Sequence, residues 1–208
     1  MSTHFYEPAE GHRLPHNPFK AIVAPRPIGW IGSRGVDGVN NLAPYSFFNA
    51  FSDEPPIVGF CSIGRKDTLQ NAEASGEFTW NLASYNLAEQ MNTSSAGLAP
   101  DHDEFALAGL TAVVGEVVAA PRVAEAGVSF ECRTTQIVQL QDTDGHAHDR
   151  WLLLGQVVGV HIQSSLLLDG EYQTAKARPI MRGGGPADYF VVSENELFKM
   201  HRPKNAGL

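Results

Sequence analysis

Pro25-Arg26-Pro27-Ile28-Gly29-Trp30-Ile31-Gly32-Ser33, followed after a short gap by Val39-Asn40-Asn41-Leu42-Ala43-Pro44, is the stretch that decides the fold class. The gap holds Gly35-Val36-Asp37-Gly38, and residues of these types adopt turn conformations readily. We predict a strand over 27–33, a turn at 35–38 and a partner strand from residue 39 into residue 44. The two strands form a hairpin.

The same pattern of short apolar runs separated by turn residues continues along the chain, which has 13 Pro and 20 Gly. Residues 57–63 are nearly all apolar and predict a strand that is buried on both faces. Further strands are predicted over 77–83, 113–118, 128–140 and 152–162, and helices over 65–76, 86–96 and 103–108. Two or three short helices among so many strands do not fit a regular βαβ winding, so we expect a mainly β fold.

Composition limits the function classes. The chain has 208 residues, 43% of them apolar, and we expect a single domain over 1–208 with a leader at about 1–18 and a mobile tail at about 199–208. A net charge of −8 without a Lys/Arg run argues against nucleic acid and against an anionic membrane. No basic-plus-apolar leader or membrane span is evident, which predicts a cytoplasmic protein. The two cysteines, Cys61 and Cys132, do not form a disulfide framework or a zinc motif.

The segment 62–68, Ser-Ile-Gly-Arg-Lys-Asp-Thr, joins a predicted strand to a predicted helix. It gathers backbone N–H groups at a helix start, two cationic side chains and a hydroxyl, with Asp67 or Thr68 available to cap the helix. Such a corner suits a phosphate monoester. A solvated cap on an ordinary surface helix is the equally weighted alternative.

The segment 40–49, Asn-Asn-Leu-Ala-Pro-Tyr-Ser-Phe-Phe-Asn, mixes amides, hydroxyls and three aromatic rings directly after a strand. An isoalloxazine ring needs hydrogen bonds at one edge and apolar cover elsewhere. Taken alone, an aromatic run is more often part of the core.

Other candidates for chemistry are weaker. Glu131 and Arg133 lie in the predicted strand 128–140, and the alternation there predicts that both face outward as a cross-strand ion pair. The histidines lack the spacing of metal ligands. No nucleophile elbow and no Gly-x-Gly-x-x-Gly turn occurs, so a nicotinamide would bind only transiently.

Four motifs in order carry a family resemblance: Pro25 to Ser33, Asn41 to Asn49, Gly64 to Asn71, and Gly76-Glu77-Phe78-Thr79-Trp80-Asn81-Leu82. Together they resemble the flavin-reductase-like family of FMN-binding split barrels over most of the chain. The resemblance implies a six-stranded Greek-key split β-barrel and a homodimer with a flavin at each subunit boundary. It also implies NAD(P)H-dependent reduction of FMN, with FAD as a possible replacement.

The resemblance also implies which residues hold the flavin. The flavin ring would be held by Ser33, Asn41, Leu42, Ala43, Pro44, Tyr45 and Ser46. The ribityl and phosphate end would be held by Ser62, Gly64, Arg65, Lys66, Asp67 and Thr68. Tyr189, after a Gly-rich loop, would belong to the far side of the pocket, contributed by the other subunit. Gly32 departs from the pattern, because a hydroxyl residue is expected beside Ser33.

Three alternatives stay open within this reading. The protein could be the reductase component of a two-component flavin monooxygenase, with an oxygenase as its partner. It could instead be a flavin-binding protein without turnover. The pocket could also accept another planar ligand, as the related pyridoxamine-phosphate-oxidase and haem-binding split barrels suggest.

Overall fold

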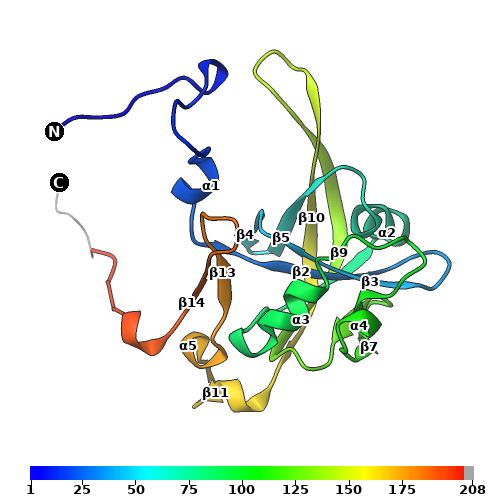
Figure 1. Cartoon of the computed structure of the whole chain (residues 1–208). Coiled ribbons are helices and arrows are strands. Elements are labelled where there is room, and N and C mark those ends of the chain that lie inside the picture. The colour runs from blue at the N-terminus through cyan, green and yellow to red at the C-terminus, as the bar shows by residue number, and fades with distance from the viewer. Residues whose placement is uncertain (204–208) are drawn as a thin grey trace.

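A computed structural model describes residues 1–203 and is mainly β (Figure 1). The strands are β1 (Arg26–Pro27), β2 (Gly29–Arg34), β3 (Asn40–Tyr45), β4 (Phe48–Asp53), β5 (Pro56–Ile63), β6 (Glu77–Asn81), β7 (Ala112–Val114), β8 (Pro121–Val123), β9 (Val128–Gln141), β10 (Ala147–Ile162), β11 (Leu167–Leu168), β12 (Glu171–Tyr172), β13 (Ile180–Arg182) and β14 (Tyr189–Val191). The helices are α1 (Phe19–Ile22), α2 (Asp67–Ser75), α3 (Ala88–Thr93), α4 (Glu104–Leu107) and α5 (Thr174–Ala177), with 3-10 turns η1 (Pro8–Glu10), η2 (Tyr85–Leu87), η3 (Ser164–Leu166) and η4 (Glu194–Glu196).

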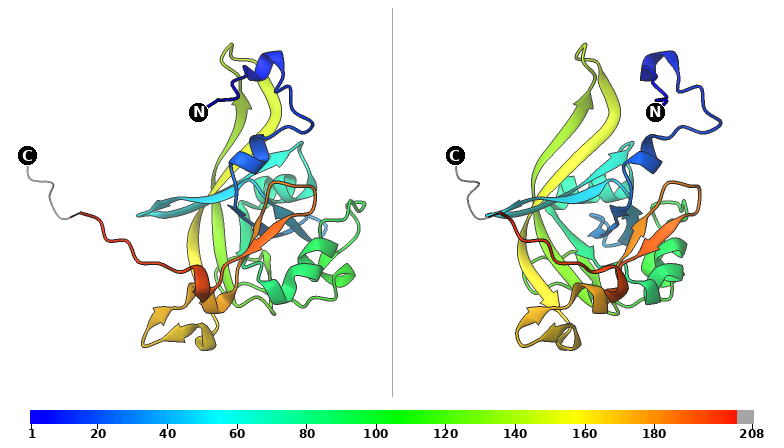
Figure 2. Two further views of the ribbon diagram at one scale, coloured as in Figure 1. Left: turned by 60° about the vertical axis from the view of Figure 1, so that its left-hand side comes forward. Right: turned by 90° about the vertical axis from the view of Figure 1, so that its left-hand side faces the viewer.

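One antiparallel sheet of seven strands forms the body, in the order β3-β2-β6-β9-β10-β5-β4. Three hairpins build it: β2–β3, β4–β5 and the long β9–β10 pair. The two edges do not close on each other, which is the split-barrel arrangement. Figure 2 shows the tip of the β9–β10 hairpin and both ends of the described chain projecting from this body. A smaller sheet, β1-β13-β14, lies beside it.

The predicted hairpin is confirmed. Strand β2 pairs with β3 from Gly29↔Tyr45 to Arg34↔Asn40. In the turn, the Gly35 N–H donates to the Val39 carbonyl at 2.9 Å, and Gly38 has φ +88°, a conformation that glycine adopts without strain. This hairpin places Asn41 to Tyr45 beside the start of α2.

Strand β2 is buried on both faces, because neighbouring residues of a strand point in opposite directions. Trp30 packs into a core cluster with Leu42, Met91 and Phe105, under α3 and α4. Ile31, its neighbour, packs into the barrel interior with hydrophobic residues of β5, β6, α2 and β9. The two cores fix the strand from opposite sides, so its outer end is a rigid base for a site.

Two of the strand predictions need correction. The family resemblance implied six strands in the barrel, but the main sheet has seven, one of which is the unpredicted edge strand β4, which pairs with β5. The predicted strand 113–118 is only three residues long, Ala112–Val114. The amides of residues 116–118 donate to the Glu131 carboxylate rather than to a neighbouring strand.

Glu131 was expected to face outward, and this was wrong. Its side chain is 0% exposed and also contacts His161 at 2.5 Å. Arg133 is exposed, as predicted, but the expected cross-strand ion pair is not found for it among the described residues. A buried carboxylate that accepts several hydrogen bonds is a structural clamp rather than a surface charge.

The helix predictions hold more closely. Helix α2 ends at Gly76, which has φ +71°, as the sequence predicted. The predicted helix 86–96 is a 3-10 turn followed by α3, and the predicted helix 103–108 is the single turn α4. Asp67 and Thr68 were expected to cap α2, but the residue at the cap is Lys66, with no capping side-chain hydrogen bond.

Within residues 1–203, no helix has the length and apolarity needed to cross a membrane. Both cysteines are free and lie in strands, Cys61 in β5 and Cys132 in β9. Half of the predicted mobile tail at 199–208 lies outside the described residues, since 204–208 are not described.

Candidate functional site

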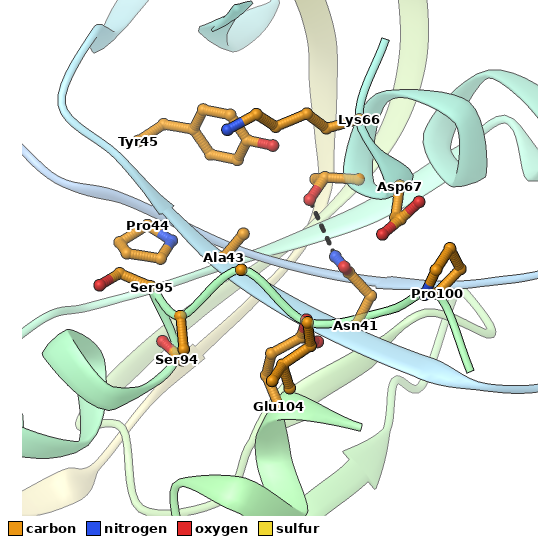
Figure 3. A pocket seen from close by; sticks show the side chains of 14 residues that line it. Asn41, Ala43, Pro44, Tyr45, Lys66, Asp67, Ser94, Ser95, Pro100 and Glu104 are labelled. Carbon is orange, nitrogen blue, oxygen red and sulfur yellow. Dashed lines mark hydrogen bonds between the residues drawn. The ribbon is translucent and has the colours of Figure 1, made fainter. Parts of the chain in front are cut away.

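A pocket of about 390 Å³ lies where the outer end of β3, the start of α2 and the segment after α3 meet (Figure 3). This size is in the range of small-molecule sites. The lining residues come from three separate segments: Asn41, Ala43, Pro44 and Tyr45; Lys66, Asp67 and Thr68; and Ser94, Ser95, Ala96, Gly97, Leu98, Pro100 and Glu104. The first two groups are the two constellations predicted from sequence, and the fold brings them together.

The start of α2 supplies the cationic side of the pocket. Before it, Gly64 has φ +80°, and the Ser62 hydroxyl donates to the Gly64 carbonyl at 2.8 Å. After this tight turn, the side chain of Lys66 lines the pocket (Figure 3). N–H groups in the first turn of a helix carry partial positive charge, so an anion bound beside Lys66 is favoured.

Hydrogen bonds between side chains fix the floor of the pocket. The Asn41 amide donates to the Thr68 hydroxyl at 2.8 Å, dashed in Figure 3, and to the Ser33 hydroxyl at 3.1 Å. Asn71 of α2 also donates to Ser33, at 3.4 Å. All three of Ser33, Asn41 and Thr68 are buried. The network ties β2, β3 and α2 together and leaves the floor rigid.

Tyr45 forms one wall. Its ring lies 4.6 Å from the Phe60 ring, measured between centroids. Burial raises the pKa of its hydroxyl, and the neighbouring Thr68 and Ser62 hydroxyls partly oppose this. The phenol is therefore neutral over the ordinary pH range and can donate one hydrogen bond.

Glu104 lies at the end of the pocket opposite Lys66 (Figure 3). Glu104 is 7% exposed, and its Oε2 atom accepts the Leu42 N–H at 3.0 Å. Burial raises the pKa of the Glu104 carboxyl, and the hydrogen bond from Leu42 partly opposes this. Asp67 also lines the pocket. With Lys66 at one end and Glu104 at the other, the pocket is polarised along its length (Figure 3).

Arg65 does not line the pocket. Its guanidinium pairs with Glu73 of α2 and lies over the Trp151 ring, 4.9 Å from the ring centroid. The side chain is about two-fifths exposed. The two adjacent cations of the sequence motif therefore point in different directions, and Lys66 alone of the two faces the pocket.

The predicted flavin-binding residues divide into three groups. Seven line the pocket: Asn41, Ala43, Pro44, Tyr45, Lys66, Asp67 and Thr68. Three are buried behind it: Ser33, Leu42 and Ser62. Four lie elsewhere on this chain: Ser46, Gly64, Arg65 and Tyr189. Ser46 borders a different hollow, and Tyr189 is 41% exposed beside Arg182.

Sequence reasoning missed the third lining segment, residues 94–100 and Glu104. The Trp30 indole donates to the Ser94 hydroxyl at 2.9 Å, which ties this segment to β2. Asp103 caps α4 by accepting the Phe105 N–H at 2.8 Å, and this fixes Glu104. The Asp-Glu-Phe run had predicted a short helix, but nothing in it indicated contact with β3.

Gly32 stands where the family pattern has a hydroxyl residue, and the reason for this is steric. A Cβ at this position would lie well inside 3.0 Å of both the Pro121 carbonyl and the Thr79 hydroxyl. These two groups hydrogen-bond to each other at 2.6 Å. No side chain fits here, so the hydroxyl expected beside Ser33 is absent for reasons of packing.

The topology and the position of the pocket place the protein in the class of split β-barrels. Residues 23–178 match the family model described as "Flavin reductase like domain". The chain therefore belongs to the flavin reductase-like family. This membership supports a flavin oxidoreductase in the general sense.

Similar proteins agree with the family assignment. An uncharacterized protein of Aquifex aeolicus is 36% identical over 183 residues, covering 84% of this chain and 88% of that protein. The crystal structure of nitrilotriacetate monooxygenase component B from Bacillus cereus has a TM-score of 0.86 and 30% identity, covering 96% of this chain and all of that one. Flavoredoxin of Desulfovibrio vulgaris, at 22% identity and a TM-score of 0.74 over 89% of this chain and 94% of its own, shares the fold.

Proposed function

We propose that this protein binds FMN in the pocket and works as an NAD(P)H-dependent flavin reductase. The observation that carries the proposal is the meeting of Lys66 and the α2 N-terminus with the polar end of β3 in one pocket. A dianionic phosphate and a planar, hydrogen-bonding ring need these two environments side by side.

The residues present fit FMN. Lys66, Thr68 and the first N–H groups of α2 would hold the phosphate, while Tyr45 and the backbone of β3 would border the ring. Arg65 is next to Lys66 in the sequence, but its guanidinium could contact the phosphate only after breaking its contacts with Glu73 and Trp151. An anionic ligand would compete with Glu73 for this guanidinium.

Bound FMN would supply a ring that accepts hydride from a nicotinamide. The chain's own residues then bind and orient, since direct hydride transfer needs no general acid or base. The Ser33–Asn41–Thr68 network holds the floor still, and the segment 94–100 covers one side from water.

We further propose a homodimer that brings a partner surface to each pocket. Several large apolar side chains support this, because Phe51, Val160 and Phe190 are all more than half exposed. A contiguous exposed apolar surface marks an interaction site, and the strands that carry Phe51 and Val160, β4 and β10, lie on either side of β5 in the same sheet. Light scattering on the purified protein should give twice the chain mass, and a monomer at micromolar concentration would contradict the dimer.

A second candidate is the reductase component of a two-component oxygenase, which would release reduced flavin to a partner. The likeness to nitrilotriacetate monooxygenase component B, complete over that chain, favours this candidate. Fast exchange of FMN with free flavin would support release, and flavin that stays bound through gel filtration would contradict it.

The direct test is a visible spectrum of the purified protein and a titration with FMN and FAD. Lys66→Ala should weaken FMN binding by about 1.5–3 kcal/mol, the range for a hydrogen bond to a charged group. Arg65→Ala should cost less, since Arg65 already has partners. Exposed Lys176→Ala is the matched control. Equal FMN affinity in wild type and Lys66→Ala would refute the phosphate site.

Turnover is tested separately by anaerobic stopped-flow mixing with NADH and with NADPH. Bleaching of the flavin absorbance at a rate that depends on nicotinamide concentration would support the reductase. Flavin that stays oxidised would instead identify a flavin-binding protein without turnover.

A further inference from the structure

We propose that Glu104 sets the orientation of the flavin by accepting a hydrogen bond from an N–H or O–H group of the ligand at the end of the pocket opposite Lys66. The inference rests on the proposed function for the identity of the ligand. It adds a residue that the family motifs did not include and names the chemistry that this residue selects.

The Glu104 carboxylate is largely buried and borders the pocket. The residue is 7% exposed, and its Oε2 atom accepts the Leu42 N–H. The backbone N–H of Glu104 itself also lowers the pKa of the carboxyl by hydrogen bonding, and among the described residues no other residue donates to Oε1. The residue lines the pocket. A carboxylate has two oxygens that each accept more than one hydrogen bond, so Glu104 can accept a further one from an N–H or O–H group of a ligand in the pocket.

The side chain is held in this position from three sides. Asp103 caps α4 through the Phe105 N–H, and the Asn40 amide donates to the other oxygen of Asp103 at 3.2 Å. Phe105, the next residue, is 1% exposed in the core beside Leu42. Glu104 is therefore fixed before a ligand arrives.

The two ends of the pocket select opposite ligand groups. Lys66 and the α2 N-terminus favour an anion, whereas Glu104 at the other end repels one (Figure 3). FMN carries its phosphate at one end and neutral donors elsewhere, namely the ring imide N–H and the ribityl hydroxyls. With the phosphate at Lys66, a donor group is the part of FMN that can lie against Glu104.

Glu104→Gln changes the polarity of this contact with little change in shape. The buried Leu42 N–H still needs an acceptor, so the glutamine oxygen faces Leu42 and the –NH₂ group faces the pocket. An acceptor thus becomes a donor, and a ligand N–H or O–H then meets another donor. The exposed residue Glu89 of α3 offers the same substitution outside the pocket as a control.

The experiment measures dissociation constants of FMN and of riboflavin, which lacks the phosphate, for wild type, Glu104→Gln and Glu89→Gln. We expect Glu104→Gln to weaken the binding of both ligands about tenfold or more, since a hydrogen bond to a charged group is lost in each case. If Glu104→Gln bound FMN more tightly than wild type and bound riboflavin with unchanged affinity, Glu104 would act only as a repelling charge. That result would overturn the inference. Equal affinities in wild type and Glu104→Gln would overturn it as well.

Two further measurements keep the result clear. The dissociation constant of 3-methyl-FMN for the wild-type protein, compared with that of FMN, tests the imide N–H. The dissociation constant of lumiflavin, compared with that of riboflavin, tests the ribityl hydroxyls. A tenfold loss with either analogue supports the inference and identifies the donor, while no loss with both overturns it without any variant. If wild type binds neither FMN nor riboflavin, the proposed function itself fails, which is a distinct outcome.

Discussion

Replacing Glu131 by Gln should destabilise the fold strongly, and this tests how the loop after β7 is held. The wild-type carboxylate accepts the amide N–H groups of Glu116, Val117 and Val118 at 2.8, 2.6 and 2.8 Å. The His161 Nε2 atom lies 2.5 Å from it. A glutamine of the same shape has one oxygen and one –NH₂ group, so some of these donors would face another donor.

The size of the effect follows from the pKa. Burial raises the pKa of the Glu131 carboxyl, but the hydrogen bonds from His161 and the three amides outweigh this and lower it from 4.5 to about 2. A difference of about 2.5 pKa units, at 1.36 kcal/mol each, gives roughly 3 kcal/mol of stability at neutral pH. Breaking a buried charge network by substitution costs 3–5 kcal/mol in other proteins, so roughly 3 kcal/mol is the expected loss.

The assay is urea unfolding of wild type and Glu131→Gln at pH 7 and at about pH 3. Because the folded pKa is depressed, the stabilisation is present above about pH 4.5 and is lost as the pH falls toward about 2. The difference between the two proteins should therefore shrink at the lower pH. Glu116→Gln, exposed in the same loop, is the control. A difference below about 1 kcal/mol at pH 7, or one that is constant with pH, would refute the clamp.

Three further substitutions test the packing and the pocket. Gly32→Ala should cost about 2–3 kcal/mol in a melting experiment because its Cβ would collide with the Pro121 carbonyl, and an unchanged melting temperature would contradict that geometry. Asp103→Ala should lose about 1 kcal/mol of stability through the α4 cap and should also weaken FMN binding in titration. Thr68→Val should cost about 1–2 kcal/mol, since the buried Asn41 amide loses an acceptor at 2.8 Å; urea unfolding measures it, and Thr93→Val is the exposed control.

Local patterns were enough to predict much of the fold. The β2–β3 hairpin depends on a four-residue turn, and α2 ends at a glycine with positive φ, so both follow from neighbouring residues. Strand β4 was missed because most of its side chains are exposed, as on an edge strand, and its aromatic residues suggested a pocket wall. The strand predicted over 113–118 failed because a distant carboxylate, Glu131, takes the amides that a strand would have shared.

The lining of the pocket was likewise predictable only where it comes from contiguous sequence motifs. Two contiguous motifs predicted seven of the lining residues, because each motif carries its own chemistry. Glu104 could not be found this way, since its role depends on the Leu42 N–H, 62 residues away in the chain. The direction of the Arg65 side chain could not be predicted from the sequence either, because its guanidinium contacts Trp151 and Glu73, which lie outside the motif.

The buried network under the pocket decides how affinity changes should be interpreted. Asn41 is held by two hydroxyls before any ligand binds, and Glu104 is held by the Leu42 N–H and by the α4 cap. Binding therefore orders few protein groups, and little of the affinity is lost to that ordering. Lys66→Ala and Glu104→Gln, of which the second keeps an acceptor for the Leu42 N–H, should then appear as a lost ligand contact with the melting temperature of the free protein unchanged. A change at Asn41 should lower both the melting temperature and the affinity, because this residue holds the floor on which the ligand lies.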